Sequence, residues 1–168
     1  MYETNRLILR KAVFSDWEQM YRNIWCHEET ARYMLWTVTE SEAAAKERME
    51  RTIAFQQSHH AWLVVEKESG KAIGFAGLRE ESGVCEDTGI AVGPRYVGKG
   101  YGTEILNELV RIAKEGLNAH GFIATCRSEN EASRKMILGC GFQFSHTEPR
   151  TDPRNGEAYT AEFYQREL

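Results

Sequence analysis

A glycine-rich segment separates a run typical of a β-strand from a long amphipathic helical pattern. It covers residues 93 to 102, and three of its glycines, Gly98, Gly100 and Gly102, occupy alternate positions. Glycine at a helix start is unfavourable unless the backbone must approach a ligand closely or adopt left-handed dihedral angles. Successive NH groups can then converge on an anion, and the positive end of the helix dipole adds to the attraction. The segment therefore predicts an anion-binding loop.

The charge of this loop differs from that of the whole chain. The loop carries Arg95 and Lys99, whereas the chain has 21 Lys and Arg against 25 Asp and Glu, a net charge of −4. A domain that neutralises many phosphates needs a basic balance, so we expect no nucleic-acid partner. A small anion must be held by a local cluster of donors. The alternative interpretation of the segment is a mobile glycine loop with solvated basic residues.

Two common phosphate-binding motifs each fail by one residue. Residues 93 to 99 fit the first part of a Walker A loop, but Gly100 stands where a Ser or Thr hydroxyl should bind magnesium. An NTPase would lack that ligand. The dinucleotide motif G-x-G-x-x-G, starting at Gly98, would need glycine at Thr103, and no early βαβ unit surrounds it.

Alternating and helical hydrophobic patterns flank the loop on both sides. Capping-box sequences at Ser15 to Glu18 and at Thr39 to Glu42 predict two early helices. A third helix is predicted over 102–119, stopped near Gly121, and a fourth from Asn130 to Gly139. Strands are predicted over residues 6–12, 61–67, 72–78, 84–92, 122–127, 141–147 and 157–165.

Length and composition fit one compact domain, residues 1–168. The chain is 42% hydrophobic and long enough to fold without disulfide or metal support. Its four cysteines, Cys26, Cys85, Cys126 and Cys140, form no C-x-x-C pair, and no secretory signal precedes them. No apolar run approaches the roughly 18 residues of a membrane span. We expect a cytoplasmic protein with no membrane partner.

The loop also matches a family signature, R-x-x-G-x-G, at Arg95, Gly98 and Gly100. Farther along, Asn130-x-x-Ser133 and Gly141-Phe142 follow in the same order and spacing as in that family. The chain thereby resembles the GNAT N-acetyltransferases over nearly its whole length. Within the family it is most similar to the branch that acetylates the α-amino termini of ribosomal proteins.

The resemblance implies both a fold and a reaction. The fold would be α/β (α+β), with a mostly antiparallel mixed sheet that is splayed at the cofactor cleft and flanked by helices. The reaction would be direct transfer of an acetyl group from acetyl-CoA to a primary amine, either a peptide N-terminus or a small amine. No metal would take part. The sequence does not determine the oligomeric state, so a homodimer stays open.

The resemblance also assigns cofactor contacts. NH groups of residues 97 to 102 would wrap the pyrophosphate, while the backbone of the strand over 88–92 would pair with the pantetheine arm. A strand NH between Ile90 and Val92 would polarise the acetyl carbonyl. Asn130 would bond the pantetheine amide, or cap a helix, or both. The implied contacts are Ile90, Ala91, Val92, Arg95, Tyr96, Val97, Gly98, Lys99, Gly100, Tyr101, Gly102, Thr103, Asn130 and Ser133.

A base is needed because the amine substrate is largely protonated at neutral pH. Asp87 lies where the branch often has a glutamate just before Gly89, and Glu86 is its neighbour. Adjacent strand residues face opposite sides, so only one of the two carboxylates should point into the cleft. We favour Asp87 and expect Asp87→Asn to reduce activity most at low pH. The alternative is a solvated carboxylate pair on a sheet face.

The leaving thiolate needs a proton or a hydrogen-bond donor. Many family members use a tyrosine, but the corresponding residue here is Ile137. The resemblance to the ribosomal-protein branch points to Ser133 instead, although serine in the first turn of a helix is also an ordinary cap residue. Because the tyrosine is absent, a non-catalytic acyl-CoA-binding or regulatory module remains the alternative function.

Other features of the sequence give weaker evidence of function. The sequence from His27 to Ala31 begins like H-E-x-x-H but lacks the second histidine, which excludes that zinc site. Aromatic residues in the region where the family builds its acceptor pocket could contact an amine through cation–π interactions, although core packing is the commoner role. These residues are Trp25, Tyr33, Trp36 and Trp62.

Overall fold

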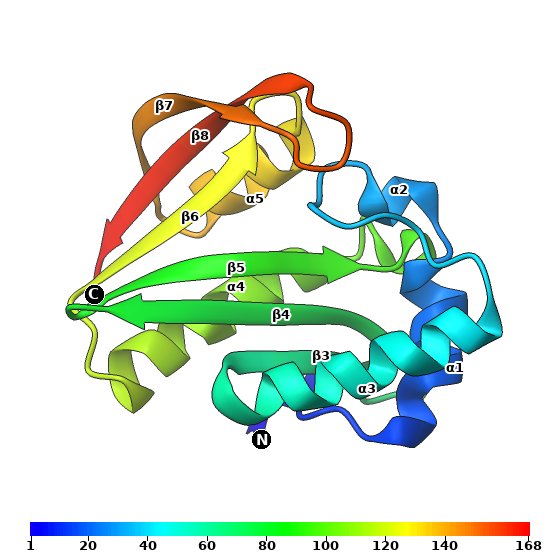
Figure 1. Cartoon of the computed structure of the whole chain (residues 1–168). Helices are drawn as coiled ribbons and strands as arrows, with labels where there is room; N and C mark the ends of the chain where they lie inside the picture. The colour runs from blue at the N-terminus through cyan, green and yellow to red at the C-terminus, as the bar shows by residue number, and fades with distance from the viewer.

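A computed structural model describes all 168 residues of the chain and contains one eight-stranded sheet (Figure 1). The strand order is β1-β2-β3-β4-β5-β6-β8-β7, and every neighbouring pair except β5 and β6 is antiparallel. The strands are β1 (Tyr2–Glu3), β2 (Leu7–Arg10), β3 (His60–Glu66), β4 (Ala72–Glu81), β5 (Val84–Val92), β6 (Gly121–Arg127), β7 (Gln143–Thr151) and β8 (Ala158–Glu167).

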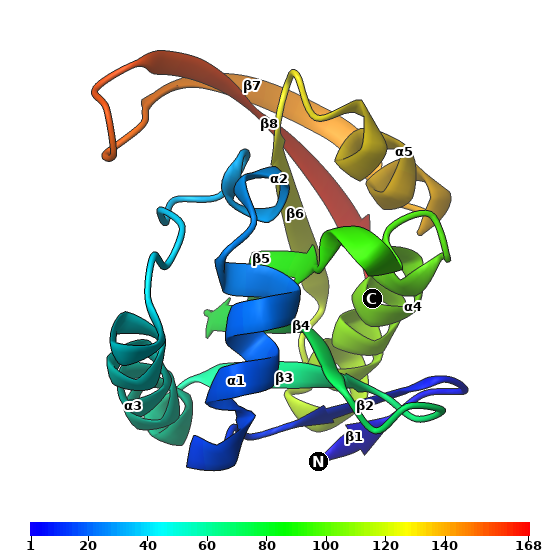
Figure 2. The same ribbon diagram turned by 90° about the vertical axis from the view of Figure 1, so that its right-hand side faces the viewer.

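Helices cover both faces of the central strands (Figure 2). The α-helices are α1 (Trp17–Met20), α2 (Glu28–Ala31), α3 (Glu42–Ser58), α4 (Tyr101–Arg111) and α5 (Glu131–Gly139). Short 3₁₀ turns η1 (Phe14–Asp16) and η3 (Pro94–Tyr96) and π-helical turns η2 (Tyr21–Trp25) and η4 (Ile112–Gly116) extend them. None of the helices combines the length and the apolar character needed to cross a membrane.

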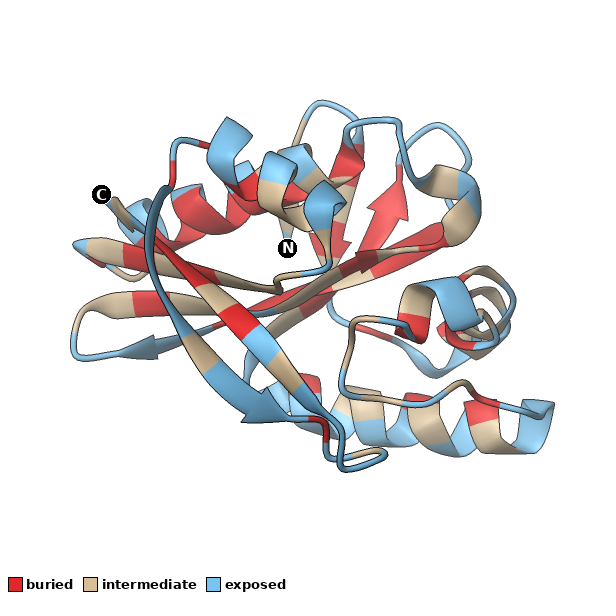
Figure 3. Ribbon diagram, turned by 90° about the horizontal axis from the view of Figure 1, so that it is seen from above, coloured by how far each residue is buried: buried red, intermediate tan, exposed pale blue.

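Two hydrophobic cores lie on the two faces of the sheet. The larger packs α4 residues such as Ile105 and Leu109 against Val64 of β3, and the smaller packs Met49 of α3 against Leu63. Neighbouring residues of β3 thus enter different cores, as the period of two in a strand requires. Figure 3 shows buried residues gathered under these helices, whereas the edge strand β7 is exposed along almost all its length.

The sheet opens between β5 and β6, as the family resemblance predicted. The two strands pair in parallel only at residues 84–86 and 121–123, and then diverge (Figure 1). A bulge in β5 marks the opening: Gly77 pairs with Gly89 and Leu78 with Asp87, which leaves Thr88 as the extra residue. Beyond Glu86, one edge of β5 therefore has no partner strand.

Two helix starts differ from the predicted capping boxes. Ser15 caps nothing; instead the buried Asp16 accepts a hydrogen bond from the NH of Val13 at 2.9 Å and pairs with Arg10. The helical path begins earlier than the box predicted, with Val13 as the N-cap of η1, so Ser15 lies inside the first turn and not at its cap. The second helix begins two residues later than the box at Thr39 predicted, because Ser41 is its N-cap and accepts from the NH of Ala44 at 3.1 Å.

The predicted helix over 102–119 is shorter in the structure. The α-helical part ends at Arg111 and continues as the π-helical turn η4 to Gly116. Asn118 then adopts a left-handed φ of 54°, which ends the helical path and turns the chain toward β6. Gly121, predicted to stop the helix, is the first residue of that strand. The short β1 and α2 have no predicted counterpart, since elements of two to four residues carry almost no periodicity.

Candidate active site

Two cavities meet at the β5 bulge. The first, which we call the splay cavity, has a volume of about 440 Å³ and lies between β5, β6 and α5. The second, the aromatic cavity, has a volume of about 1250 Å³ and lies against β3, β4 and α3. Both are lined by Leu35, Trp36, Phe75, Thr88 and Gly89. Two ligands that enter from different directions could therefore meet beside Gly89.

The glycine-rich loop has the backbone geometry of an anion cradle. Gly98 and Gly100 adopt left-handed φ angles of 77° and 79°, a conformation that other residues rarely adopt. The NH groups of Val97 to Gly100 donate no hydrogen bond to the protein. The NH groups of the first turn of α4 also lack partners, since Gly100 caps the helix without a side chain. The loop thus presents a row of free donors at a helix start.

Contacts from the N-terminus hold this loop in place. Arg6 donates from Nη1 to the carbonyl of Lys99 at 2.9 Å and from Nε to Glu104 of α4 at 2.7 Å. The phenol of Tyr101 turns away from the loop and donates to Glu66, which raises the pKa of Tyr101 to about 12. Only the backbone of Tyr101 is therefore free to contact a ligand at the loop.

The basic and aromatic side chains of the loop remain at the surface. Arg95 and Lys99 are exposed, and Lys99 Nζ lies 5.3 Å from the ring of Tyr96. Val97 is 62% exposed. Gly102 and Thr103 lie in the first turn of α4, and a Cβ on Gly102 would approach Met136 of α5 to 2.6 Å. A side chain at Gly102 would therefore require the side chain of Met136 to shift.

The free edge of β5 presents alternate NH groups to the splay cavity. Gly93 donates to the carbonyl of Ile73 of β4 at 2.8 Å. Because successive strand NH groups point to opposite edges, those of Val92 and Ile90 face away from β4, and that of Ala91 faces β4. Of the three predicted strand contacts, the backbone NH groups of Ile90 and Val92 are placed to meet a ligand.

Asp87 lies at the point where β5 and β6 separate. Its Oδ2 accepts a hydrogen bond from the NH of Thr125 of β6 at 2.9 Å, across the opening. Burial of the carboxyl raises its pKa to about 7, and the nearby charge of Glu86 adds to the shift, while hydrogen bonds from Thr125 and Gly89 oppose it. Near neutral pH this group can therefore both accept and release a proton.

Glu86 has a different environment. Its carboxylate forms an ion pair with Arg79 of β4 and is 29% exposed. Strand alternation predicted that only one of the two carboxylates would point into the cleft, but both Glu86 and Asp87 line the splay cavity. The free edge of the strand itself forms the cavity wall, so residues on both faces of the strand contribute to it. The ion pair engages Glu86, whereas no basic side chain pairs with Asp87, which favours Asp87 as the base.

The start of α5 brings Asn130 and Ser133 to the opposite wall of the splay cavity. Asn130 Oδ1 accepts from the backbone NH of Ser133 at 3.1 Å, so the predicted N-cap is confirmed. The side-chain NH₂ of Asn130 and the hydroxyl of Ser133 have no partner within the protein and remain free for a ligand. Ile137, at the position of the family tyrosine, is buried in the same wall.

Sequence reasoning missed several residues at the end of β6 and in the β7–β8 hairpin. Tyr159 of β8 lines the splay cavity, and Arg127 lies over its ring at 3.9 Å. Arg127 and Arg154 both pair with the buried Asp152, at 2.6 and 2.7 Å, which holds the pKa of Asp152 far below its usual range. No motif marks these residues, since they meet only through the β7–β8 hairpin.

Arg154 also fastens that hairpin to the segment after α2. Its Nη1 donates to the carbonyls of Ala31 and Trp36 at 2.9 and 3.1 Å. In Figure 1 the β7–β8 turn lies beside α2, although more than a hundred residues separate them. Because Trp36 lines both cavities, this contact fixes the wall that they share.

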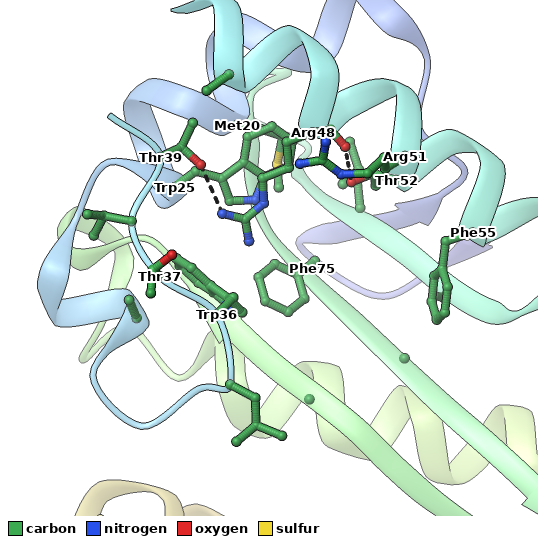
Figure 4. Close-up of a pocket in the computed structure, with 18 of the residues that line it drawn as sticks. Met20, Trp25, Trp36, Thr37, Thr39, Arg48, Arg51, Thr52, Phe55 and Phe75 are labelled. Atoms are coloured by element: carbon green, nitrogen blue, oxygen red, sulfur yellow. Dashed lines mark hydrogen bonds between the residues drawn. The ribbon is translucent and has the colours of Figure 1, made fainter. Parts of the chain in front are cut away.

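Aromatic side chains dominate the second cavity (Figure 4). Trp25, Trp36, Phe55 and Phe75 line it, and the rings of Trp36 and Phe75 meet edge to face at 6.3 Å between centroids. Trp62 also lines this cavity but is only 3% exposed and belongs to the larger core. The predicted Tyr33 instead lines the splay cavity.

Comparison with known proteins identifies similar sequences. The family model described as acetyltransferase (GNAT) domain matches residues 6–143. The uncharacterized N-acetyltransferase YoaA of Bacillus subtilis (strain 168) is 25% identical over 166 residues, which cover 96% of this chain and 93% of that protein. The match thus extends over nearly the full length of both.

Solved structures share the fold at lower identity. A putative ribosomal-protein-serine acetyltransferase from Vibrio cholerae superposes with a TM-score of 0.79 at 22% identity, covering 99% of this chain and 96% of that one. The microcin C7 self-immunity acetyltransferase MccE, solved with acetyl-CoA and AMP, gives a TM-score of 0.82 at 18% identity, covering 98% and 94%. Both comparisons show that the overall fold is shared.

Proposed function

This chain belongs to the GNAT acetyltransferase family, and on that premise we propose that it transfers the acetyl group of acetyl-CoA directly to a primary amine. The observation that carries the proposal is the meeting of two cavities at Gly89, where the free edge of β5 is exposed to both. A donor in one cavity and an acceptor in the other would meet at that edge.

The cradle at the start of α4 fits the pyrophosphate of coenzyme A. Free NH groups from Val97 to Thr103 supply donors, the left-handed Gly98 and Gly100 leave the approach open, and the exposed Arg95 and Lys99 add positive charge. The side-chain NH₂ of Asn130, which has no partner in the protein, would bond the pantetheine arm. When bound, acetyl-CoA supplies the activated acetyl thioester.

The free edge of β5 orients the reacting group. NH groups of Ile90 and Val92 point away from β4, so they can pair with the arm as a neighbouring strand would and polarise the acetyl carbonyl. These donors are fixed by the β4–β5 ladder, and they need no rearrangement as negative charge develops on the carbonyl oxygen.

Two side chains would handle the protons. Asp87, with a pKa near 7, takes a proton from the protonated amine, directly or through water, and passes it to solvent before the neutral amine attacks. As the new C–N bond forms and the C–S bond breaks, Asp87 takes a second proton from the nitrogen. The hydroxyl of Ser133, free in the facing wall, gives its proton to the departing sulfur. Ser133 then recovers a proton from solvent, and Asp87 releases one.

The second candidate function is an acyl-CoA-binding module without catalysis, which the buried Ile137 in place of a tyrosine favours. An acceptor screen read by thiol release, with a metal chelator present, separates the two. We expect chelator-insensitive thiol release with at least one class of peptide or small amine. Binding of acetyl-CoA without release above background, across the whole panel, would support the binding module.

We further propose that the protein works in the cytoplasm. All four cysteines are free thiols, and a reducing compartment keeps thiols in that state.

The buried Cys85 and Cys140 have their pKa raised by burial, which makes them poor nucleophiles. This supports direct transfer to the amine rather than an acyl-cysteine route.

A further inference from the structure

Three arginines line the aromatic cavity, and one of them has no acidic partner. Arg154 pairs with Asp152 at 2.7 Å, and Arg51 lies 4.0 Å from Glu47. Arg48 makes no ion pair, and its only side-chain hydrogen bond is from Nη1 to Thr39 Oγ1 at 3.0 Å. Four of the five N–H donors of its guanidinium are therefore left without a partner in the protein.

The Arg48 guanidinium contacts the rings of two tryptophans in the cavity wall (Figure 4). Its Cζ lies 4.7 Å from the centroid of Trp25 and 4.3 Å from that of Trp36. Ring faces favour a cation and hold the guanidinium plane, while its edge remains free for hydrogen bonds. Burial and the charge of Arg51 lower the pKa of Arg48 to about 10, so it stays charged at neutral pH.

This arrangement is unfavourable for the empty protein. A half-buried cation without a counter-ion loses part of its solvation, and cation–π contacts recover only some of that loss. An apolar side chain of similar length could pack between the tryptophans without this penalty. The two acidic residues in the lining, Glu28 and Glu40, are exposed and form no ion pair with Arg48. The missing anion is therefore expected to come from a ligand.

Resting on the proposed acetyl transfer, we propose that Arg48 binds an acidic group of the acceptor, which is an amine that also carries a carboxylate or a phosphate. The aromatic cavity joins the splay cavity at Trp36, Phe75 and Gly89. An acceptor held by its acidic group at Arg48 could thus direct its amine to β5. The aromatic walls suit an acceptor whose amine and acidic group are joined by an apolar segment. A polyamine is disfavoured as acceptor, because it would bring a second ammonium group toward the positive charge of Arg48.

Matched pairs of acceptors test this directly. Three pairs are compared, each an acid and its neutral partner. The first is phenylalanine and phenylalaninamide, and the second is a dipeptide and the same dipeptide with an amidated C-terminus. The third is 2-aminoethyl phosphate and ethanolamine. We expect at least one acidic member to exceed its neutral partner by about tenfold or more in kcat/KM, as a charge-assisted bidentate pair would provide. The carboxylate and phosphate arms show which anion is preferred.

Variants then test whether Arg48 is the residue that causes the preference for acidic acceptors. Arg48→Gln should abolish it by raising KM, with kcat nearly unchanged, because the contact is made equally in the ground and transition states. Arg48→Lys should keep part of it. Arg22→Gln, at an exposed arginine that pairs with Glu18 and lines neither cavity, is the control and should keep the preference. Unchanged thermal stability and acetyl-CoA binding would show that Arg48→Gln is folded.

The proposal is overturned if neutral partners are used as well as the acids, or if Arg48→Gln retains the preference. If no amine is acetylated at all, the proposed function fails while the anion site can still be tested. N-acetylphenylalanine and its amide are then titrated against tryptophan fluorescence, with inorganic phosphate as a third probe. Binding of an acid that Arg48→Gln loses supports the site, whereas no acid-selective binding by the parent overturns it.

Discussion

The two ends of the candidate site are prepared for their ligands in opposite ways. At the start of α4, the donors are backbone NH groups placed by the left-handed Gly98 and Gly100, and the nearby cations are exposed. In the aromatic cavity, the donor is the single half-buried side chain of Arg48, packed against two tryptophans. A backbone cradle depends on main-chain shape, whereas a side-chain site depends on one residue.

This difference predicts which substitutions matter most. At the cradle, changes at glycine should be severe and changes at lysine mild. In the walls of the two cavities, changing a single side chain should alter turnover without altering ligand binding, or the reverse. The variants below follow that order from the largest expected effect to the smallest.

The largest effect is expected for Gly100→Val. A β-branched residue is strained at a φ of 79°, and its side chain would occupy the space that the pyrophosphate must enter. We expect loss of measurable acetyl-CoA binding by calorimetry, at least about 100-fold, which is about 2.7 kcal/mol. Circular dichroism should show a folded protein, since Gly100 is exposed outside the core. Unchanged binding would mean that the phosphates bind elsewhere.

The next effect concerns Ser133→Ala. Its proposed proton donation acts on the departing sulfur and contributes little to the ground state, so turnover should fall by about 10- to 100-fold while acetyl-CoA binding changes by less than about twofold. Calorimetry and steady-state kinetics on the same preparation measure both. An unchanged kcat would remove Ser133 from the mechanism.

Asp87→Asn should change the pH profile. A base with a pKa near 7 is ionised above that pH, so kcat/KM of the parent should rise with pH through 7, and the loss in the variant should be largest above 7. From the sequence alone, the loss of activity in Asp87→Asn was expected to be largest at low pH. The raised pKa of Asp87 reverses that expectation, because the carboxyl is protonated and inactive as a base below pH 7. Glu86→Gln is the matched control and should retain the rise. If the control loses it instead, the choice of carboxylate is wrong.

The same carboxyl group should affect folding. Its pKa is about 7 in the folded chain and near 4 when unfolded, so the folded state holds the proton more tightly. The free energy of unfolding should therefore fall as pH rises from about 4 to about 7. Denaturant titrations across this range should show a smaller fall for Asp87→Asn than for the parent. An equal fall in both would contradict the raised pKa.

Arg154→Gln tests the wall between the cavities. Loss of its bonds to Asp152 and to the carbonyls of Ala31 and Trp36 should destabilise the fold by about 2 kcal/mol and raise KM for the acceptor more than for acetyl-CoA. Arg150→Gln, an exposed arginine paired with Glu148, should change stability by less than about 0.5 kcal/mol. Equal effects of the two variants would refute the special role of Arg154.

The smallest effect is expected for Lys99→Ala. A single exposed cation adds a screened attraction, whereas the free NH groups and the helix terminus remain without it. Acetyl-CoA affinity should fall by less than about tenfold, and the difference from the parent should shrink as salt is added. A loss as large as that of Gly100→Val would show that side-chain charge, and not the backbone, holds the anion.

The same contrast explains what could be predicted from the sequence. The loop, the strand over 84–92 and the cap at Asn130 depend on residues close together in the chain, where periodicity and glycine spacing are informative. Their bounds agree closely with β5 and α5. The box at Ser15 was wrong because the helical path starts earlier, at Phe14, where Asp16 accepts from the NH of Val13 and pairs with Arg10. Spacing does not reveal that side-chain contact.

The acceptor side could not be predicted for a related reason. Asp87 meets Thr125, Arg154 meets Trp36, and Arg48 meets Trp25, each across elements that only the folded sheet brings together. The raised pKa of Asp87 likewise follows from burial at the separation of two strands, and no local pattern reports burial of that kind.

The most direct test of acetyl transfer at the β5 edge is the stoichiometry of a single turnover. Excess protein is mixed with isotopically labelled acetyl-CoA and a reactive acceptor from the screen, in the presence of chelator, and both products are measured by mass spectrometry. The account predicts one N-acetylated amine for each coenzyme A released, with no label on the protein. Release of coenzyme A with label on a cysteine, or as free acetate without acetylated amine, would contradict it.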